Sequence, residues 1–109
     1  MSDITTHVLD ITLGKPAAGV GIRLEKLDED DWLTLAESAT DADGRCRNLA
    51  SGVAPGLYRL VFDIGRYFDE QNRTSIYPEA CITFRCRGDA HYHLPLLLSN
   101  NSYTTYRGS

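Results

Sequence analysis

The sequence predicts an all-β protein: an antiparallel β-sandwich of seven or eight short strands with one short helix. Three observations support this prediction. Apolar and polar residues alternate with a period of two, turn residues interrupt the alternation about every ten residues, and no repeat or linker divides the chain. A chain of 109 residues is also short enough to form a single domain, which we expect to span 1–109.

The first third of the chain alternates between strands and turns. A strand expected over 4–12 ends at the turn Gly14-Lys15-Pro16. A second strand, over 19–27, ends at the acidic turn 28–31 and is followed by a third strand over 32–38. These segments therefore predict neighbouring strands connected by short turns.

Two strong turn signals mark the middle of the chain. Asp43-Gly44, within DADGRCRNL, favours a tight turn, and Pro55-Gly56 opens another. A strand over 57–64 follows. Alternation places Val20, Ile22 and Leu24 on one face of the second strand, and Tyr58, Leu60 and Phe62 on one face of this one.

One segment, GRYFDEQNRTSIYPE, departs from the alternating pattern. Residues 66–73 contain no Gly, Pro or β-branched residue, so we expect a short helix there that ends before Pro78. Strand character then resumes over 80–86, 91–99 and 102–106.

The charge and hydropathy of the chain exclude several classes of partner. A net charge of −4 and a pI of about 5.2 argue against binding to nucleic acid or anionic membranes, which requires a basic surface. No stretch approaches the ~20 apolar residues of a membrane span, and the first residues lack the pattern of a secretion signal. We therefore expect a cytoplasmic protein with neither nucleic-acid nor membrane partners.

The three cysteines, Cys46, Cys81 and Cys86, form no recognisable motif. Their odd number and the absence of C-x-x-C predict neither a disulfide framework nor a zinc ribbon. Reduced thiols, as in a cytoplasm, are the expectation.

The strand over 91–99 places its histidines on an outer face. Tyr92, Leu94, Leu96 and Leu98 share a face that should enter the core, whereas the other face carries His91, His93, Pro95, Leu97 and Ser99. On the first strand, alternation puts His7 on the same side as Thr5 and Leu9. An outer face that combines imidazoles with Pro95 and Leu97 is typical of a subunit interface or a ligand site.

Other interpretations of the histidines remain open. They are also consistent with exposed polar residues at the end of a strand. A His-x-His pair with His7 as a third ligand could instead hold zinc, although no carboxylate or Cys is placed in sequence to complete the site.

Two further features have both an ordinary and a functional interpretation. Arg45 directly follows the turn at Asp43-Gly44, where its guanidinium would lie near a loop tip, either solvated or directed at a ligand. Tyr106 and Arg107 lie in the last four residues, which in most domains form a flexible terminus.

Taken together, these segments resemble the 5-hydroxyisourate hydrolases, the enzymatic branch of the transthyretin-like family. The segments are THVLD…GKPAAGV, TDADGR, GRYFDEQNRTSIYPE and HYHLPLLLS…YTTYRGS, which occur in order over nearly the whole chain. The terminal YRGS is the most specific of them, because the hormone-carrying transthyretins lack it and lack the histidines as well.

The resemblance implies a transthyretin-like sandwich that assembles as a homotetramer, a dimer of dimers, with active sites at the dimer–dimer interface. It implies hydrolysis of 5-hydroxyisourate to 2-oxo-4-hydroxy-4-carboxy-5-ureidoimidazoline in urate catabolism, with no cofactor and no metal. The site residues that it implies are His7, Arg45, His93 and Ser109 for catalysis, and His7, Arg45 and Tyr106 for substrate binding. His91 has no usual role in the family. One departure is Asn100-Asn101-Ser102, which stands where relatives usually have a tyrosine and a glycine.

The residue types suit the implied reaction, the hydrolysis of the N1–C6 amide bond. Water is a poor nucleophile and needs a base, and histidine has an ordinary pKa of about 6.5. Arg45 would offer a permanent positive charge to the oxyanion that develops. A carrier that binds a planar ligand without turnover and a purely structural interaction domain are the alternatives.

Overall fold

The computed structural model describes residues 2–88 and 90–108 and shows, within them, nine strands and one helix. The helix is α1 (Ile64–Asp69). The strands are β1 (Ser2–Asp10), β2 (Lys15–Pro16), β3 (Gly21–Asp28), β4 (Asp31–Ala39), β5 (Arg45–Val53), β6 (Gly56–Phe62), β7 (Ala80–Cys86), β8 (Tyr92–Ser99) and β9 (Ser102–Thr105).

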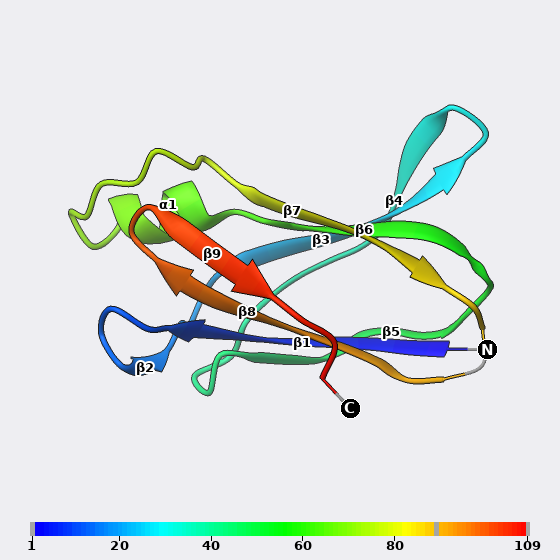
Figure 1. The fold of residues 1–109 in the computed structure, drawn as a ribbon, viewed down its shortest axis with the longest axis horizontal. Helices are drawn as coiled ribbons and strands as arrows, with labels where there is room; N and C mark the ends of the chain where they lie inside the picture. Colours follow the sequence, from blue (N-terminus) through cyan, green and yellow to red (C-terminus); the bar gives the residue numbers. More distant parts are fainter. Residues whose placement is uncertain (1, 89, 109) are drawn as a thin grey trace.

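The strands form two sheets, which confirms the predicted sandwich (Figure 1). In one sheet β1 pairs with β2 and β5 and with β8, and β9 follows β8 at the far edge. The other sheet has the order β4-β3-β6-β7. The pairing is antiparallel except between β1 and β8, which run parallel. The purely antiparallel prediction is corrected there, because β8 follows β7 of the other sheet rather than a hairpin turn from β1.

The faces that alternation predicted for three strands fill the core between the sheets, as expected for the apolar face of β8. The core-facing residues of β3, β6 and β8, together with Val20, are each at most 7% exposed. They are Val20, Ile22, Leu24, Tyr58, Leu60, Phe62, Tyr92, Leu94, Leu96 and Leu98. Burial of each large apolar side chain contributes roughly 1.5–3 kcal/mol to stability.

The first hairpin differs from the prediction. β1 ends at Asp10, because the Asp10 carboxylate accepts a hydrogen bond from the Leu13 N–H (3.1 Å) and begins the turn. Gly14 completes the reversal with a φ of 68°. Lys15 and Pro16, predicted as part of the turn, instead form the short strand β2 beside the end of β1.

The helix also has different ends from the predicted ones. It begins at Ile64, two residues before the predicted start, and it ends at Asp69 rather than Arg73. Its buried residues are Ile64, Tyr67 and Phe68, so packing against the core decides where it forms. Asn72 adopts a φ of 55° and the Arg73 N–H donates to the Phe68 carbonyl (3.0 Å), which turns the chain out of the helix.

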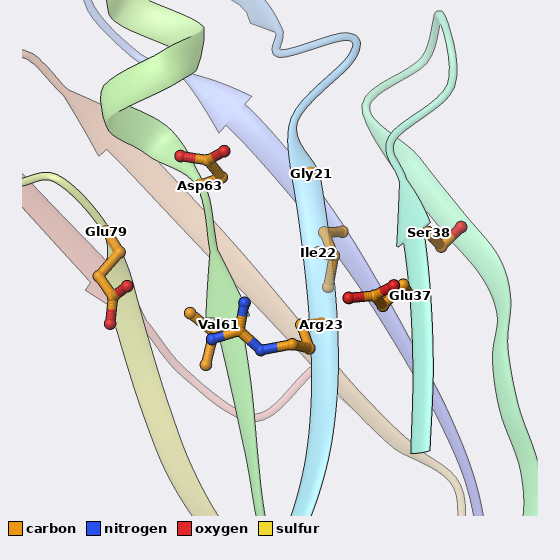
Figure 2. Close-up of a pocket in the computed structure, with 8 residues that line it drawn as sticks. All are labelled: Gly21, Ile22, Arg23, Glu37, Ser38, Val61, Asp63 and Glu79. Atoms are coloured by element: carbon orange, nitrogen blue, oxygen red, sulfur yellow. The ribbon is translucent and has the colours of Figure 1, made fainter. Parts of the chain in front are cut away.

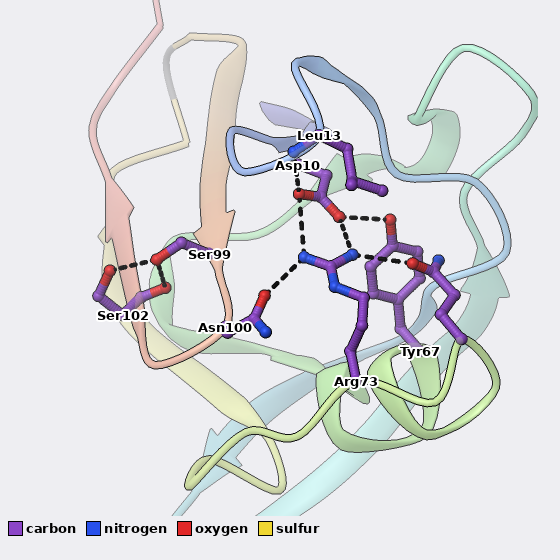
Figure 3. Close-up of polar contacts among 8 residues, drawn as sticks. Asp10, Leu13, Tyr67, Arg73, Ser99, Asn100 and Ser102 are labelled. Carbon is purple, nitrogen blue, oxygen red and sulfur yellow. Dashed lines mark hydrogen bonds and ion pairs between the residues drawn. The ribbon is translucent and has the colours of Figure 1, made fainter.

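A buried ion pair connects β1, the segment after α1 and the β8–β9 turn (Figure 3). The Asp10 side chain is 0% exposed and accepts hydrogen bonds from Arg73 Nη1 (2.6 Å) and the Tyr67 hydroxyl (2.8 Å). Arg73 Nη2 also donates to Asn100 Oδ1 (2.7 Å). Burial alone would raise the pKa of Asp10, but the hydrogen bonds from Arg73, Tyr67 and Leu13 outweigh burial and lower it.

The unusual Asn100-Asn101-Ser102 turn has side-chain partners of its own. Besides the bond from Arg73 to Asn100, Asn101 Oδ1 accepts a hydrogen bond from the Ile76 N–H (3.0 Å). The two asparagines thus attach the β8–β9 turn to the segment between α1 and β7. This attachment fixes the point from which β9 runs toward the chain end.

Candidate active site

The register of the sheet brings His7, Arg45 and His93 to one outer face. His7 pairs with Arg45 between β1 and β5, and Thr5 pairs with His93 between β1 and β8. Thr5 and His7 are two residues apart on β1 and therefore point to the same side. We name this surface, formed by Thr5, His7, Arg45, His91 and His93, the histidine face.

Hydrogen bonds hold all three imidazoles of the histidine face. The Thr5 hydroxyl lies 2.7 Å from His91 Nε2 and 2.8 Å from His93 Nδ1. His7 Nε2 lies 3.0 Å from the Asp43 carbonyl oxygen. Since a carbonyl only accepts, His7 Nε2 carries a hydrogen and the Nδ1 of the neutral ring is the basic nitrogen.

Sequence reasoning placed Thr5 on this face but assigned it no function. A threonine in a strand gives no functional signal, because its branched side chain already suits strand geometry. Only the parallel pairing of β1 with β8 shows that its hydroxyl lies between two histidines.

A hollow of about 270 Å³ lies on the histidine face. It is lined by Thr5, Thr6, Arg45, Arg47, His91 and His93. Drug-sized ligands occupy pockets of roughly 300–1,000 Å³, so this one suits a smaller molecule. The two arginines and the histidines make its walls positive or hydrogen-bonding, which favours a polar, oxygen-rich ligand.

The pKa of His93 is lowered below its ordinary value. The main cause is burial, followed by the repulsion that His91, Arg45 and His7 in their protonated forms exert on a protonated His93. His93 is therefore neutral near pH 7. A neutral imidazole that adjoins a hollow can accept a proton, which is what a general base requires.

The chain end folds back onto β8 rather than extending as a flexible terminus. The Gly108 N–H donates to the His93 carbonyl (2.7 Å), and the Arg107 guanidinium carbon lies 4.3 Å from the centre of the Tyr92 ring. Gly108 also packs against the His93 ring, because a Cβ added to it would lie only 2.7 Å from His93 Cδ2. Arg107 and Gly108 thus lie against β8, with Gly108 beside His93.

Three expected site residues are not placed in the hollow. His7 lies on the same outer face, paired with Arg45, but it does not line the hollow. Tyr106 is 52% exposed and does not line it. Ser109 lies outside the described residues. The apolar part of the outer face also differs from expectation, since Pro95 is buried and Leu97 half-buried. Their strand, β8, is central in its sheet, between β1 and β9, so neighbouring strands cover it.

A second hollow, of about 420 Å³, lies over the other sheet (Figure 2). Its lining residues are Gly21, Ile22, Arg23, Glu37, Ser38, Val61, Asp63 and Glu79. Figure 2 shows the carboxylates of Glu37, Asp63 and Glu79 spread around Arg23. None of the described lining residues is a histidine or a cysteine, so this hollow offers no base that titrates near neutral pH. The histidine face is the better candidate.

Three further observations concern metals, thiols and membranes. Within residues 2–88 and 90–108, no three His, Cys, Asp or Glu side chains gather closely enough to hold a metal ion. All three cysteines are free thiols, with Cys46 and Cys86 buried and Cys81 exposed. In the same described ranges, no helix has the length and apolar character to cross a membrane.

Comparison with known proteins places the chain among close relatives. Residues 4–108 match a family model described as "HIUase/Transthyretin family". A 5-hydroxyisourate hydrolase of Caulobacter vibrioides is 46% identical over 115 residues, which cover 100% of both chains. The structure of Klebsiella pneumoniae 5-hydroxyisourate hydrolase is similar with a TM-score of 0.90 and 38% identity, and 100% of each chain is covered.

A protein with a different activity has an equally similar fold. Sea bream transthyretin in complex with thyroxine gives a TM-score of 0.93 at 33% identity, over 96% of this chain and 93% of that one. The backbone alone therefore does not separate hydrolysis from ligand binding, and the side chains of the histidine face must do so.

Proposed function

The chain belongs to the HIUase/transthyretin family, and from this membership we propose that it is a hydrolase that acts on 5-hydroxyisourate. The observation that carries the proposal is the histidine face, where the sheet register places His7, Arg45 and His93 together. A carrier needs a cavity to hold its ligand. It does not need a neutral base such as His93 beside a permanent cation such as Arg45. Relatives named for this hydrolysis match the chain over its full length.

The proposed reaction opens the substrate ring at its N1–C6 amide bond. An imidazole of His93 or His7 takes a proton from water, and the resulting hydroxide attacks C6. The electrons of the carbonyl move to its oxygen, where Arg45 stabilises the negative charge. When the C6–N1 bond breaks, the imidazolium returns its proton to N1. The product, 2-oxo-4-hydroxy-4-carboxy-5-ureidoimidazoline, retains the elements of the added water.

The last residues complete the proposed site. Tyr106 holds the substrate ring, and Ser109 supplies a hydroxyl and a terminal carboxylate that orient a histidine or the water. The contact of their neighbour Gly108 with His93 supports this assignment. No metal and no other cofactor takes part.

Further parts of the proposal concern assembly and setting. We expect a homotetramer, a dimer of dimers, in which neighbouring subunits enclose the histidine faces. The open hollow supports this, because exclusion of water would strengthen the electrostatic contacts of Arg45 with the substrate. The hydrolysis belongs to urate catabolism, and we place it in the cytoplasm.

The test is to add the protein to freshly generated 5-hydroxyisourate and to follow its ultraviolet absorbance. The compound should decay far faster than it does spontaneously. The rate of decay should be proportional to protein concentration and should not change when a strong chelator is added. The likeness to a transthyretin that binds thyroxine makes a carrier the second candidate. A carrier would bind the compound, detectable by equilibrium dialysis of a stable analogue such as urate, without accelerating its decay.

A further inference from the structure

One hydroxyl on the histidine face contacts two imidazoles. Thr5 Oγ1 lies within hydrogen-bond distance of His91 Nε2 and His93 Nδ1, at 2.7 and 2.8 Å. Thr5 comes from β1, whereas both histidines belong to the segment that enters and forms β8. The hydroxyl therefore bridges two imidazole side chains that are two residues apart in the sequence.

The number of hydrogens on this bridge limits its arrangements. A threonine hydroxyl carries one hydrogen and can donate to only one of the two rings. At least one imidazole must therefore donate to Thr5. The neutral form of each ring has a single N–H. Whether a ring donates to Thr5 or accepts from it therefore decides which of its nitrogens remains basic.

We propose that Thr5 is a positioning residue that accepts the Nδ1–H of His93 and thereby keeps Nε2 of His93 as the basic nitrogen. This inference rests on the proposed function, in which His93 takes a proton from water. The hydroxyl hydrogen of Thr5 is then donated to Nε2 of His91. In this way His91 influences the proposed base through Thr5.

The surroundings of the two rings favour this direction. His91 is exposed, so water can satisfy its Nδ1, which donates in the proposed arrangement and accepts in the opposite one. His93 is half-buried, and Gly108 packs against its Cδ2 edge. A flip of the His93 ring would exchange Cδ2 with Nδ1 and break the bond to Thr5. Thr5 on one side and Gly108 on the other therefore fix the ring. Within residues 2–88 and 90–108, the side-chain hydrogen bond of His93 is made by Nδ1, and Nε2 has no partner.

The opposite arrangement would leave His93 without a usable base. If Thr5 donated to His93 Nδ1, the single N–H of the neutral ring would be on Nε2. Its lone pair on Nδ1 would then be occupied by the Thr5 hydroxyl. Water bound beside Nε2 could not lose a proton to this ring.

The direct test is the tautomer of His93, read from the ¹⁵N shifts of its imidazole at a pH where it is neutral. The resonances are assigned by their loss in His93→Gln. The wild type and Thr5→Ser should show the Nδ1–H form. Thr5→Val, which has nearly the same shape but no hydroxyl, should shift the ring toward the Nε2–H form. Thr5→Ala serves as a second variant if Thr5→Val does not fold.

Kinetics give the second measurement. Loss of a partner that orients a reactive side chain typically costs ~10–100-fold. We expect kcat to fall by that factor in Thr5→Val, with KM within about threefold of wild type, and Thr5→Ser to restore most of it. A wild type with His93 in the Nε2–H form, or a Thr5→Val variant with unchanged tautomer and kcat, would overturn the inference. The measurement of the tautomer needs no substrate. It therefore tests the role of Thr5 even if the wild type fails to hydrolyse 5-hydroxyisourate.

Discussion

At the residue scale, the chemistry of the site depends on the charge of the His93 imidazole. Burial lowers the pKa of His93, and the positive charges that His91, Arg45 and His7 carry in their protonated forms lower it further. The same positive charges that favour an oxygen-rich substrate therefore also keep the proposed base neutral. An arginine beside a histidine disfavours protonation of the imidazole. This is useful where the imidazole must stay neutral to act as a base.

The lowered pKa of His93 predicts the pH dependence of hydrolysis. The base form is lost when His93 is protonated, so kcat/KM should fall on the acid side at a pH below the ordinary histidine value of about 6.5. His91→Gln removes one of the side chains that lower the pKa of His93, so the acid limb should move to higher pH. A pH–rate profile of both proteins provides the measurement. An acid limb above pH ~6.5 in the wild type would contradict the assignment of His93 as base.

At the scale of elements, the segment after β9 positions the site through backbone contact. The Gly108 N–H bonds to the His93 carbonyl, and a Cβ at Gly108 would meet the His93 ring at 2.7 Å. Real Cβ atoms do not approach other atoms so closely, so either the ring or the chain end must move. The absence of a side chain at this position is thus a condition for the observed ring orientation.

Gly108→Ala should therefore impair activity more than stability. A displacement of about 1 Å in a reacting group can cost on the order of 10²-fold in rate. We expect a loss of kcat of that order, with Tm nearly unchanged because Gly108 lies near the chain end. Thr104→Ala, on the half-exposed strand β9, is a suitable control and should retain activity. Wild-type activity in Gly108→Ala would show that the chain end does not set the position of His93.

The ion pair of Asp10 with Arg73 should be the most stabilising polar contact among the elements at this end of the molecule. Breaking a buried ion pair by removing one partner costs about 3–5 kcal/mol. Arg73→Met should destabilise by this amount at pH 7, measured by urea unfolding at fixed protein concentration. Arg66→Met is the control, because its pair with Glu70 is exposed and contributes at most ~1 kcal/mol. Equal effects of the two substitutions would show that burial of the pair has no energetic importance.

The acid stability of this end follows from the direction of the Asp10 shift. The pKa of Asp10 is lower in the folded protein, so the stabilisation is complete above the ordinary aspartate pKa of about 3.9. It is lost as the pH falls through the lower, folded value. Arg73→Met should accordingly lose its excess instability in strong acid.

Most strands could be predicted locally, but β2 and β5 were missed, and the partners of each strand could not be predicted. Alternation correctly separates Thr6 and Val8 from Thr5 and His7, because successive side chains in a strand point to opposite faces. The contact of Thr5 with His93 joins residues 88 positions apart and depends on the parallel pairing of β1 with β8. No local pattern contains that information.

The helix shows a second reason why a prediction fails. Residue types between 66 and 73 favour a helix, yet it ends at Asp69. The buried Asp10 carboxylate binds Arg73, and Asn72 allows the left-handed turn that delivers it. A tertiary contact thus overrides helix propensity, which is weak over so few residues.

At the scale of the whole molecule, assembly is the main expectation beyond the single chain. Ile11, Leu13 and Ile76 are exposed by 56%, 46% and 72%, which leaves apolar side chains available for contacts between subunits. Light scattering at micromolar concentration should give about four times the chain mass of 12.1 kDa. A stable monomer with full activity would contradict the proposal that subunits enclose the histidine face.

The central claim is that the histidine face performs hydrolysis, and the most direct measurement compares its two neighbouring histidines. Substitution of His93 by Ala should lower kcat/KM for fresh 5-hydroxyisourate by on the order of 10²–10⁴-fold, the usual contribution of a general base. His91→Ala should have a milder effect, because His91 acts on His93 indirectly, through Thr5 and through its charge. Both variants should keep the oligomeric state of the wild type. Full activity in His93→Ala, or equally severe losses in both variants, would contradict this account.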